Sequence, residues 1–117
     1  MDFLTIVNNL VGNAIAYTDE GSVTVEAKYV KDSFTLRVSD TGCGISRSEQ
    51  DRVFERFYRV ESTRAAYAQG TGLGLPLVSS IVASVDGKIA LESDLGEGST
   101  FTVVLPTINQ RVAANRN

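Results

Sequence analysis

Three glycines at alternate positions stand directly before an apolar segment, in the stretch QGTGLGLPL (residues 69–77). Because Gly70, Gly72 and Gly74 tolerate positive φ and close approach, their successive N–H groups can converge on an anion. A helix starting near Leu75 would add the positive end of its dipole. The stretch therefore predicts a phosphate cradle, with a flexible hinge or turn as the alternative. Its spacing is not the dinucleotide pattern G-x-G-x-x-G.

One acidic residue precedes another pair of glycines, in SDTGCGI (residues 39–45). Asp40 ends an alternating segment and is followed by Gly42 and Gly44, which places its carboxylate at the end of a strand where the backbone opens into a pocket. A carboxylate there can accept a hydrogen bond from an exocyclic amine and so distinguish adenine from guanine. The alternative is an Asx turn, which is common where Asp precedes Thr-Gly.

Two asparagines and a tyrosine are spaced for one line along a helix. Asn9, Asn13 and Tyr17 fall at i, i+4 and i+8, on a line that borders the apolar stripe of the segment. Stacked amide oxygens can share Mg²⁺ with phosphates, because this ion prefers oxygen ligands. Solvated asparagines beside a core are the alternative.

An aromatic and basic segment, VFERFYR, occupies residues 53–59. Phe54, Phe57 and Tyr58 fit satellite packing better than a ligand face. Arg59 and Arg64 are either solvated charges or, if this loop covers a triphosphate, neutralise its charge.

Several classes of protein are excluded by composition. The 117 residues contain no histidine, which removes the commonest general base and the usual zinc ligand, and one cysteine, Cys43, which leaves no internal disulfide. No P-loop motif is present. The net charge of −3 and the lack of a basic cluster argue against nucleic-acid binding. No apolar run approaches the roughly 20 residues that span a bilayer.

The periodicity of apolar residues predicts the elements that position these groups. A helix is expected over residues 2–17 and another over 75–85, with strands at 22–30, 33–40, 88–94 and 99–106; the first two strands form a hairpin. Residues 65–74 read as a mobile loop, and the charged stretch before it as short helices. This order predicts a single α/β sandwich with helices on one face of a sheet.

The order of the motifs is more specific than any one of them. Asn-x-x-x-Asn, Asp-x-Gly-x-Gly, a Phe-rich segment, Gly-x-Gly-x-Gly and Gly-x-Gly-Ser-Thr-Phe resemble, in that sequence, the ATP-binding catalytic domain of bacterial sensor histidine kinases, in the Bergerat-fold ATPase superfamily. The resemblance covers residues 2–106. It implies a two-layer sandwich with a mixed, mostly antiparallel sheet of about five strands on about three helices.

The same resemblance implies a site for ATP and Mg²⁺. Asn13, assisted by Asn9, would hold the metal, Asp40 would bind the adenine amine, and residues 58–72 would form a mobile ATP lid anchored by Phe54 and Phe57. Arg59, Arg64 and Gln69 are candidate phosphate contacts, with no catalytic residue assigned. The remaining expected nucleotide contacts are Tyr17, Gly42, Gly44, Ile45, Gly70, Thr71, Gly72, Leu73, Gly74 and Thr100.

One position favours a kinase over a hydrolase. Gyrase-like and chaperone ATPases resemble one another in carrying a Glu where this chain has Asn9, and that Glu activates water. Without such a base the γ-phosphoryl is kept for another acceptor. Two departures, Ala16 in place of a common Lys and Val85-Asp86-Gly87 in place of His-Gly-Gly, bear on affinity more than on function.

The acceptor must lie outside the sequence, since the family's acceptor is a histidine. We expect residues 1–106 to be the catalytic domain, with a disordered tail at 107–117, excised from a longer sensor that is anchored in the bacterial inner membrane. The expected partners are its dimerisation domain and a response regulator, and the isolated cytoplasmic domain is expected to be monomeric. The alternatives are an anti-sigma-type serine kinase and a nucleotide-sensing pseudokinase.

Overall fold

The computed structural model describes residues 3–55 and 74–106. The elements follow in the order α1 (Phe3–Tyr17), β1 (Val23–Val30), β2 (Ser33–Asp40), α2 (Arg47–Gln50), α3 (Gly74–Ser84), β3 (Lys88–Asp94) and β4 (Gly98–Pro106). Each predicted helix and strand is present with ends shifted by a residue or two.

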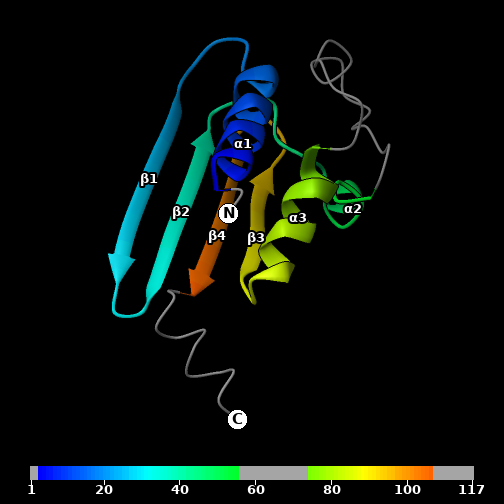
Figure 1. Ribbon diagram of the computed structural model, residues 1–117. Coiled ribbons are helices and arrows are strands. Elements are labelled where there is room, and N and C mark those ends of the chain that lie inside the picture. Colours follow the sequence, from blue (N-terminus) through cyan, green and yellow to red (C-terminus); the bar gives the residue numbers. More distant parts are fainter. Residues whose placement is uncertain (1–2, 56–73, 107–117) are drawn as a thin grey trace.

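Four antiparallel strands form one sheet in the order β1-β2-β4-β3. The helices lie on one face of it, with α1 over the middle of the sheet and α3 beside it over β3 (Figure 1). This confirms the two-layer α/β sandwich. The described residues contain four strands, where the family resemblance implied about five.

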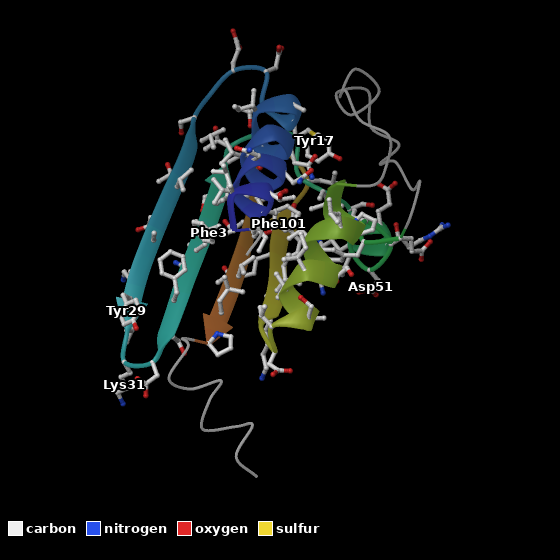
Figure 2. The ribbon with its side chains drawn as sticks, viewed as in Figure 1. Phe3, Tyr17, Tyr29, Lys31, Asp51 and Phe101 are labelled. Atoms are coloured by element: carbon white, nitrogen blue, oxygen red, sulfur yellow. The ribbon has the colours of Figure 1, made fainter. Side chains whose placement is uncertain are left out.

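The core lies between the helices and the sheet. Ile6 and Leu10 of α1 and Val78 and Val82 of α3 are fully buried against the inner face of β2 and β4. Phe101 of β4 points into this layer (Figure 2). Burial of such side chains contributes about 1.5–3 kcal/mol each, so the apolar period of the two helices accounts for their docking.

Strand β1 is less covered than its partners. Val25 and Tyr29, on the same side of the hairpin as the core, are 47% and 68% exposed. Figure 2 shows Tyr29 and Lys31 at one end of the sheet, far from Tyr17 at the C-terminal end of α1. The alternation predicted for β1 is therefore correct, while most of its apolar face stays open to solvent.

Elements that carry several of the predicted site residues meet at the other end of the sheet. Strand β2 ends there at Asp40, the turn between β3 and β4 lies there, α1 ends there and α3 begins there (Figure 1). The fold thus brings together motifs that are up to about 90 residues apart in the chain.

Candidate nucleotide site

Asp40 is the buried acidic group of this end of the sheet, with 7% of its surface exposed. Its Oδ1 accepts hydrogen bonds from the backbone N–H groups of Gly42 (2.9 Å) and Ser99 (3.3 Å). No other described residue donates to the carboxylate, which leaves Oδ2 without a partner in this part of the chain. Burial raises the pKa of Asp40, and the two backbone hydrogen bonds oppose that rise.

The bond from Gly42 is the Asx turn that the sequence offered as an alternative. The turn is confirmed and uses Oδ1, while the adenine interpretation stays a prediction that concerns Oδ2. The carboxylate is therefore fixed through one oxygen while the other can accept a hydrogen bond from a ligand.

The loop that follows Asp40 is pressed against neighbouring backbone on two sides. A methyl group on Gly42 would overlap the carbonyl oxygen of Tyr17, and one on Gly44 would overlap that of Asp94. Hydrogen bonds from Cys43 N–H to Tyr17 O (3.2 Å) and from Gly96 N–H to Cys43 O (2.8 Å) tie the loop to α1 and to the β3–β4 turn. Because only glycine fits at these two positions, the conformation of the loop depends on its two glycines as well as on the pairing of the strands.

Of the two hydroxyl residues that begin β4, the one beside Asp40 is Ser99. In the register of β2 and β4, Asp40 pairs with Ser99 and Ser39 pairs with Thr100. Ser99 is buried on the inner face, whereas the Thr100 hydroxyl donates to Ser39 Oγ (3.1 Å) on the face away from the helices. The structure thus separates the Thr100 side chain from Asp40 and brings Ser99 there instead.

Asn9 of α1 lies near the first residue of α3. Asn9 Nδ2 donates to Thr5 O (2.8 Å), and its Oδ1 lies 2.7 Å from the position that a Cβ on Gly74 would occupy. Asn13 is half-buried one turn further along α1, and its amide has no hydrogen-bond partner in the described ranges. Tyr17, half-buried, packs against the core at the end of the same line. The line therefore borders the buried stripe, as predicted.

Of the predicted aromatic cluster, Phe54 is among the described residues, whereas Phe57 and Tyr58 lie outside them. Phe54 packs edge-on against Phe101, with ring centroids 6.2 Å apart, which supports the packing interpretation for this residue. Ile45 is 1% exposed and belongs to the core, and its backbone N–H donates to Ser93 Oγ (2.8 Å).

The family model described as histidine kinase-, DNA gyrase B- and HSP90-like ATPase matches residues 1–109. This chain belongs to that family.

Similar proteins place it among the sensor kinases of the family. It is 43% identical over 104 residues to the sensor-like histidine kinase SenX3 of Mycolicibacterium smegmatis, covering 88% of this chain and 27% of SenX3. It is 42% identical over 102 residues to the sensor histidine kinase RppB of Synechocystis, covering 86% of this chain and 22% of RppB. The chain spans about a quarter of the length of these relatives. It is a catalytic ATP-binding domain of the sensor-histidine-kinase type.

Solved structures agree. The mycobacterial sensor histidine kinase MprB superposes with a TM-score of 0.75 at 30% identity, over 87% of this chain and 70% of that one. Full-length ShkA, solved in complex with AMPPNP, superposes with a TM-score of 0.73 at 31% identity, over 87% of this chain and 20% of ShkA.

Part of the predicted histidine-kinase site lies outside the described residues. This holds for Phe57 and the lid at 58–72, with Arg59, Arg64, Gln69, Gly70, Thr71, Gly72 and Leu73. Gly74, the last glycine of the motif, is the first residue of α3. Pro76 falls in the first turn of that helix, where the missing N–H costs no intrahelical hydrogen bond.

The departures from the family pattern lie at different distances from this site. Ala16 is on α1 next to Tyr17. Val85-Asp86-Gly87 ends α3, where Gly87 N–H donates to Val82 O (2.8 Å) and Asp86 adopts a φ of 61°. This is the opposite end of an eleven-residue helix from Gly74, about 16 Å away along its axis.

Three residues of the site were missed by the sequence interpretation: Ser99, Ser93 and Gln50. The position of Ser99 could have been predicted, because strand alternation places it on the same face of the sheet as Phe101 and Asp40. Ser93 and Gln50 had none, since their contacts join segments that are more than 40 residues apart.

No helix in the described ranges is long and apolar enough to cross a membrane. Those ranges also contain no group of three or more His, Cys, Asp or Glu side chains that could hold a metal ion.

Proposed function

We propose that this domain binds Mg²⁺·ATP between Asp40 and the first turn of α3 and donates the γ-phosphoryl group to a histidine of a dimerisation domain. The observation that carries the proposal is the Asp40 carboxylate, which is buried, held through Oδ1 by two backbone N–H groups and unpartnered at Oδ2 among the described residues. A carboxylate oxygen that no protein group uses can accept a hydrogen bond from a ligand, and the N6 amine of adenine is such a donor.

The choice of adenine follows from the hydrogen-bonding character of this end. The amine of adenine donates to a carboxylate, whereas the O6 carbonyl of guanine would place an acceptor against it. Gly42 and Gly44 shape the backbone beside the carboxylate. Ser99 joins Asp40 on the inner face, and we assign it the role that the sequence gave to Thr100.

The phosphates would lie toward Gly74. The first turn of α3 offers unpaired N–H groups and a positive dipole end, and the motif glycines precede it in the chain. The lid residues Arg59, Arg64, Gln69, Gly70, Thr71, Gly72 and Leu73 are proposed to complete this end.

The α1 amides suit Mg²⁺. Asn13 has an amide oxygen that no described residue uses, and Asn9 turns its oxygen toward Gly74. When bound, the ion would neutralise charge on the β- and γ-phosphates. Oxygen ligands from amides, phosphates and water satisfy its preferences.

Transfer is favoured over hydrolysis because the position of the water-activating Glu in hydrolytic relatives is Asn9. Its amide nitrogen donates to Thr5 O, and an amide has no useful basicity. The γ-phosphoryl group would then be transferred by attack of an imidazole nitrogen instead of water. This chain contains no histidine, so the acceptor is supplied by another domain.

The wider setting is proposed from the relatives. The dimerisation domain of the same protein would be the acceptor, a response regulator would receive the phosphoryl group next, and the parent protein would be anchored in the inner membrane with this domain in the cytoplasm. The isolated domain is proposed to be a monomer with residues 1–106 as its folded unit.

Titration with a fluorescent ATP analogue and Mg²⁺ tests the binding. We expect saturable binding that Asp40→Asn weakens by about tenfold, because the amide places a donor where the amine must donate. Unchanged affinity in this variant would refute the assignment of Asp40.

Phosphotransfer is tested separately, with γ-labelled ATP and the dimerisation domain of a similar kinase. We expect label on a histidine of the added domain and little free phosphate without it. Rapid release of phosphate with no labelled histidine would favour a hydrolase instead.

A further inference from the structure

The Ser93 hydroxyl joins three segments of the Asp40 end. Ser93 lies near the end of β3, half-buried on the inner face. Its Oγ is within hydrogen-bond distance of Ile45 N (2.8 Å), Gly98 O (2.9 Å) and Ser99 Oγ (2.8 Å). These atoms belong to the loop after Asp40 and to the first two residues of β4, so that with β3 itself three segments are joined.

The direction of each hydrogen bond follows from a count of protons. A serine hydroxyl has one proton to donate and two lone pairs. Gly98 O can only accept, so Ser93 donates to it, while Ile45 N–H can only donate, so Ser93 accepts from it. The bond with Ser99 must then run from Ser99 to Ser93. All three hydrogen-bonding positions of Ser93 Oγ are thereby used within the protein.

The consequence reaches Asp40 through one peptide group. Gly98 O and Ser99 N belong to the same peptide, so Ser93 holds its oxygen while its N–H donates to Asp40 Oδ1 (3.3 Å). Gly98 has a φ of 117°, outside the range of ordinary strand residues, so β geometry alone does not set the orientation of this peptide. A hydrogen bond to the carbonyl also polarises the peptide and strengthens its N–H as a donor.

The Ser93 backbone is itself held from another element. Gln50, at the end of α2, donates from Nε2 to Ser93 O (3.0 Å) and to Ile45 O (2.9 Å). These two hydrogen bonds fix the position of the Ser93 backbone. The Ser93 hydroxyl can therefore fix the orientation of the Gly98–Ser99 peptide.

We propose that Ser93 is a positioning residue for base recognition: it orients the Gly98–Ser99 peptide, whose N–H aims the Asp40 carboxylate at the amine of the nucleotide. This inference rests on the proposed function and adds the group that sets its selectivity. Ser93 need not touch the nucleotide. Its removal should weaken the interaction with the amine while leaving contacts to ribose and phosphates in place.

The test compares ATP with ITP, in which a carbonyl replaces the N6 amine and N1 carries a proton, while the ribose and the triphosphate are unchanged. The ratio Kd(ITP)/Kd(ATP) measures the use of the amine. In Ser93→Ala we expect this ratio to fall by roughly three- to tenfold, the effect of weakening one hydrogen bond to a charged group. Most of the change should be in the affinity for ATP.

A matched control and a rescue keep the result specific. Ser39→Ala also removes one hydroxyl–hydroxyl hydrogen bond beside Asp40, but on the outer face of the sheet, so the ratio should stay at its wild-type value. Ser93→Thr should retain the wild-type ratio and Ser93→Val should lose it. This pair differs by little more than the hydroxyl group and serves if the alanine variant folds poorly.

The outcomes separate this proposal from the proposed function. If wild-type protein prefers ATP and Ser93→Ala lowers both affinities by the same factor, Ser93 is only structural and the inference is overturned. The same holds if the ratio does not change. If wild-type protein does not prefer ATP over ITP, the assignment of Asp40 fails first. In an Asp40→Asn background, a further fall in the ratio on Ser93→Ala would also contradict the proposal.

Discussion

The two ends of the proposed nucleotide site are built differently. Around Asp40, the main contacts are made by backbone: N–H groups of Gly42 and Ser99 fix the carboxylate, and Gly42 and Gly44 leave no space between the loop and its neighbours. Around Gly74, the nearest group is a side chain, the amide of Asn9. Backbone contacts that form on folding thus fix the proposed base end. The proposed phosphate end depends instead on side-chain amides, which a bound ligand would organise.

This difference predicts where stability and binding are coupled. Substitutions in the Asp40 loop should change both, because the same backbone contacts serve the fold and the site. Substitutions among the α1 amides should change ligand binding with little effect on folding.

The largest effect is expected from Gly42→Ala. The added methyl group would overlap Tyr17 O and lie 2.9 Å from Thr18 Oγ1, so the loop and the end of α1 must separate. We expect the free energy of unfolding to fall by about 3 kcal/mol, measured by urea denaturation, with loss of nucleotide binding.

The control for that substitution is Gly12→Ala, in α1. Nothing lies within 4 Å of its Cβ position, and replacing a helical glycine by alanine should raise the free energy of unfolding by about 0.5–1 kcal/mol. Equal effects of the two variants would contradict the close packing of the Asp40 loop.

The next effect tests the phosphate end. In Asn13→Ala we expect the Mg²⁺-dependent affinity for ATP to fall by about tenfold or more, while the free energy of unfolding changes by less than about 0.5 kcal/mol. Calorimetric titration with and without Mg²⁺ measures the first and denaturation the second. Asn8→Ala, an exposed asparagine on the same helix, should leave both unchanged. A loss of affinity that persists without Mg²⁺ would remove Asn13 from the metal.

At the base end, Asp40 should make the free energy of unfolding depend on pH. Because the pKa of Asp40 is raised in the folded protein, the folded state holds this proton more tightly than the unfolded chain does. Its contribution to stability is therefore lost as pH rises from the unfolded pKa, about 3.9, through the raised folded value.

Asp40→Asn removes this loss, so its stability relative to wild type should increase between about pH 3 and pH 7. Urea denaturation of both proteins at the two pH values measures the change. A constant difference between them would mean that Asp40 titrates as it does in the unfolded chain.

The smallest effect should come from a residue remote from both ends. Asp86 has a φ of 61° where α3 terminates, a position that favours glycine. Asp86→Gly should raise the free energy of unfolding by about 0.5–1 kcal/mol and leave the affinity for ATP unchanged. A change in affinity would indicate coupling along α3 that the contrast between the two ends does not include.

Local patterns were enough to predict most of the fold. The helical periods of α1 and α3, the alternation of four strands and the Lys31–Asp32 hairpin were all visible in the sequence and are confirmed. Coverage of β1 could not be predicted, because alternation shows which face is apolar and says nothing of what packs on it.

The site was predictable only as far as each residue acts locally. The spacing of Asp40 and Gly42 was enough to predict the Asx turn, since its hydrogen bond joins residues two apart in the chain. The family resemblance indicates Thr100, whereas the strand register places Ser99 beside Asp40. The hydrogen bonds of Ser93 and Gln50 depend on how distant segments meet, which no local pattern encodes.

The most direct measurement follows the backbone amides of Gly42 and Ser99 by NMR as Mg²⁺·ATP is added to labelled domain. Both donate to Asp40 Oδ1, so an amine bound at Oδ2 should move their resonances together, with the same saturation as calorimetric binding. ITP should move them much less. If ATP binds and these two amides do not respond, or respond equally to ITP, Asp40 does not read the base.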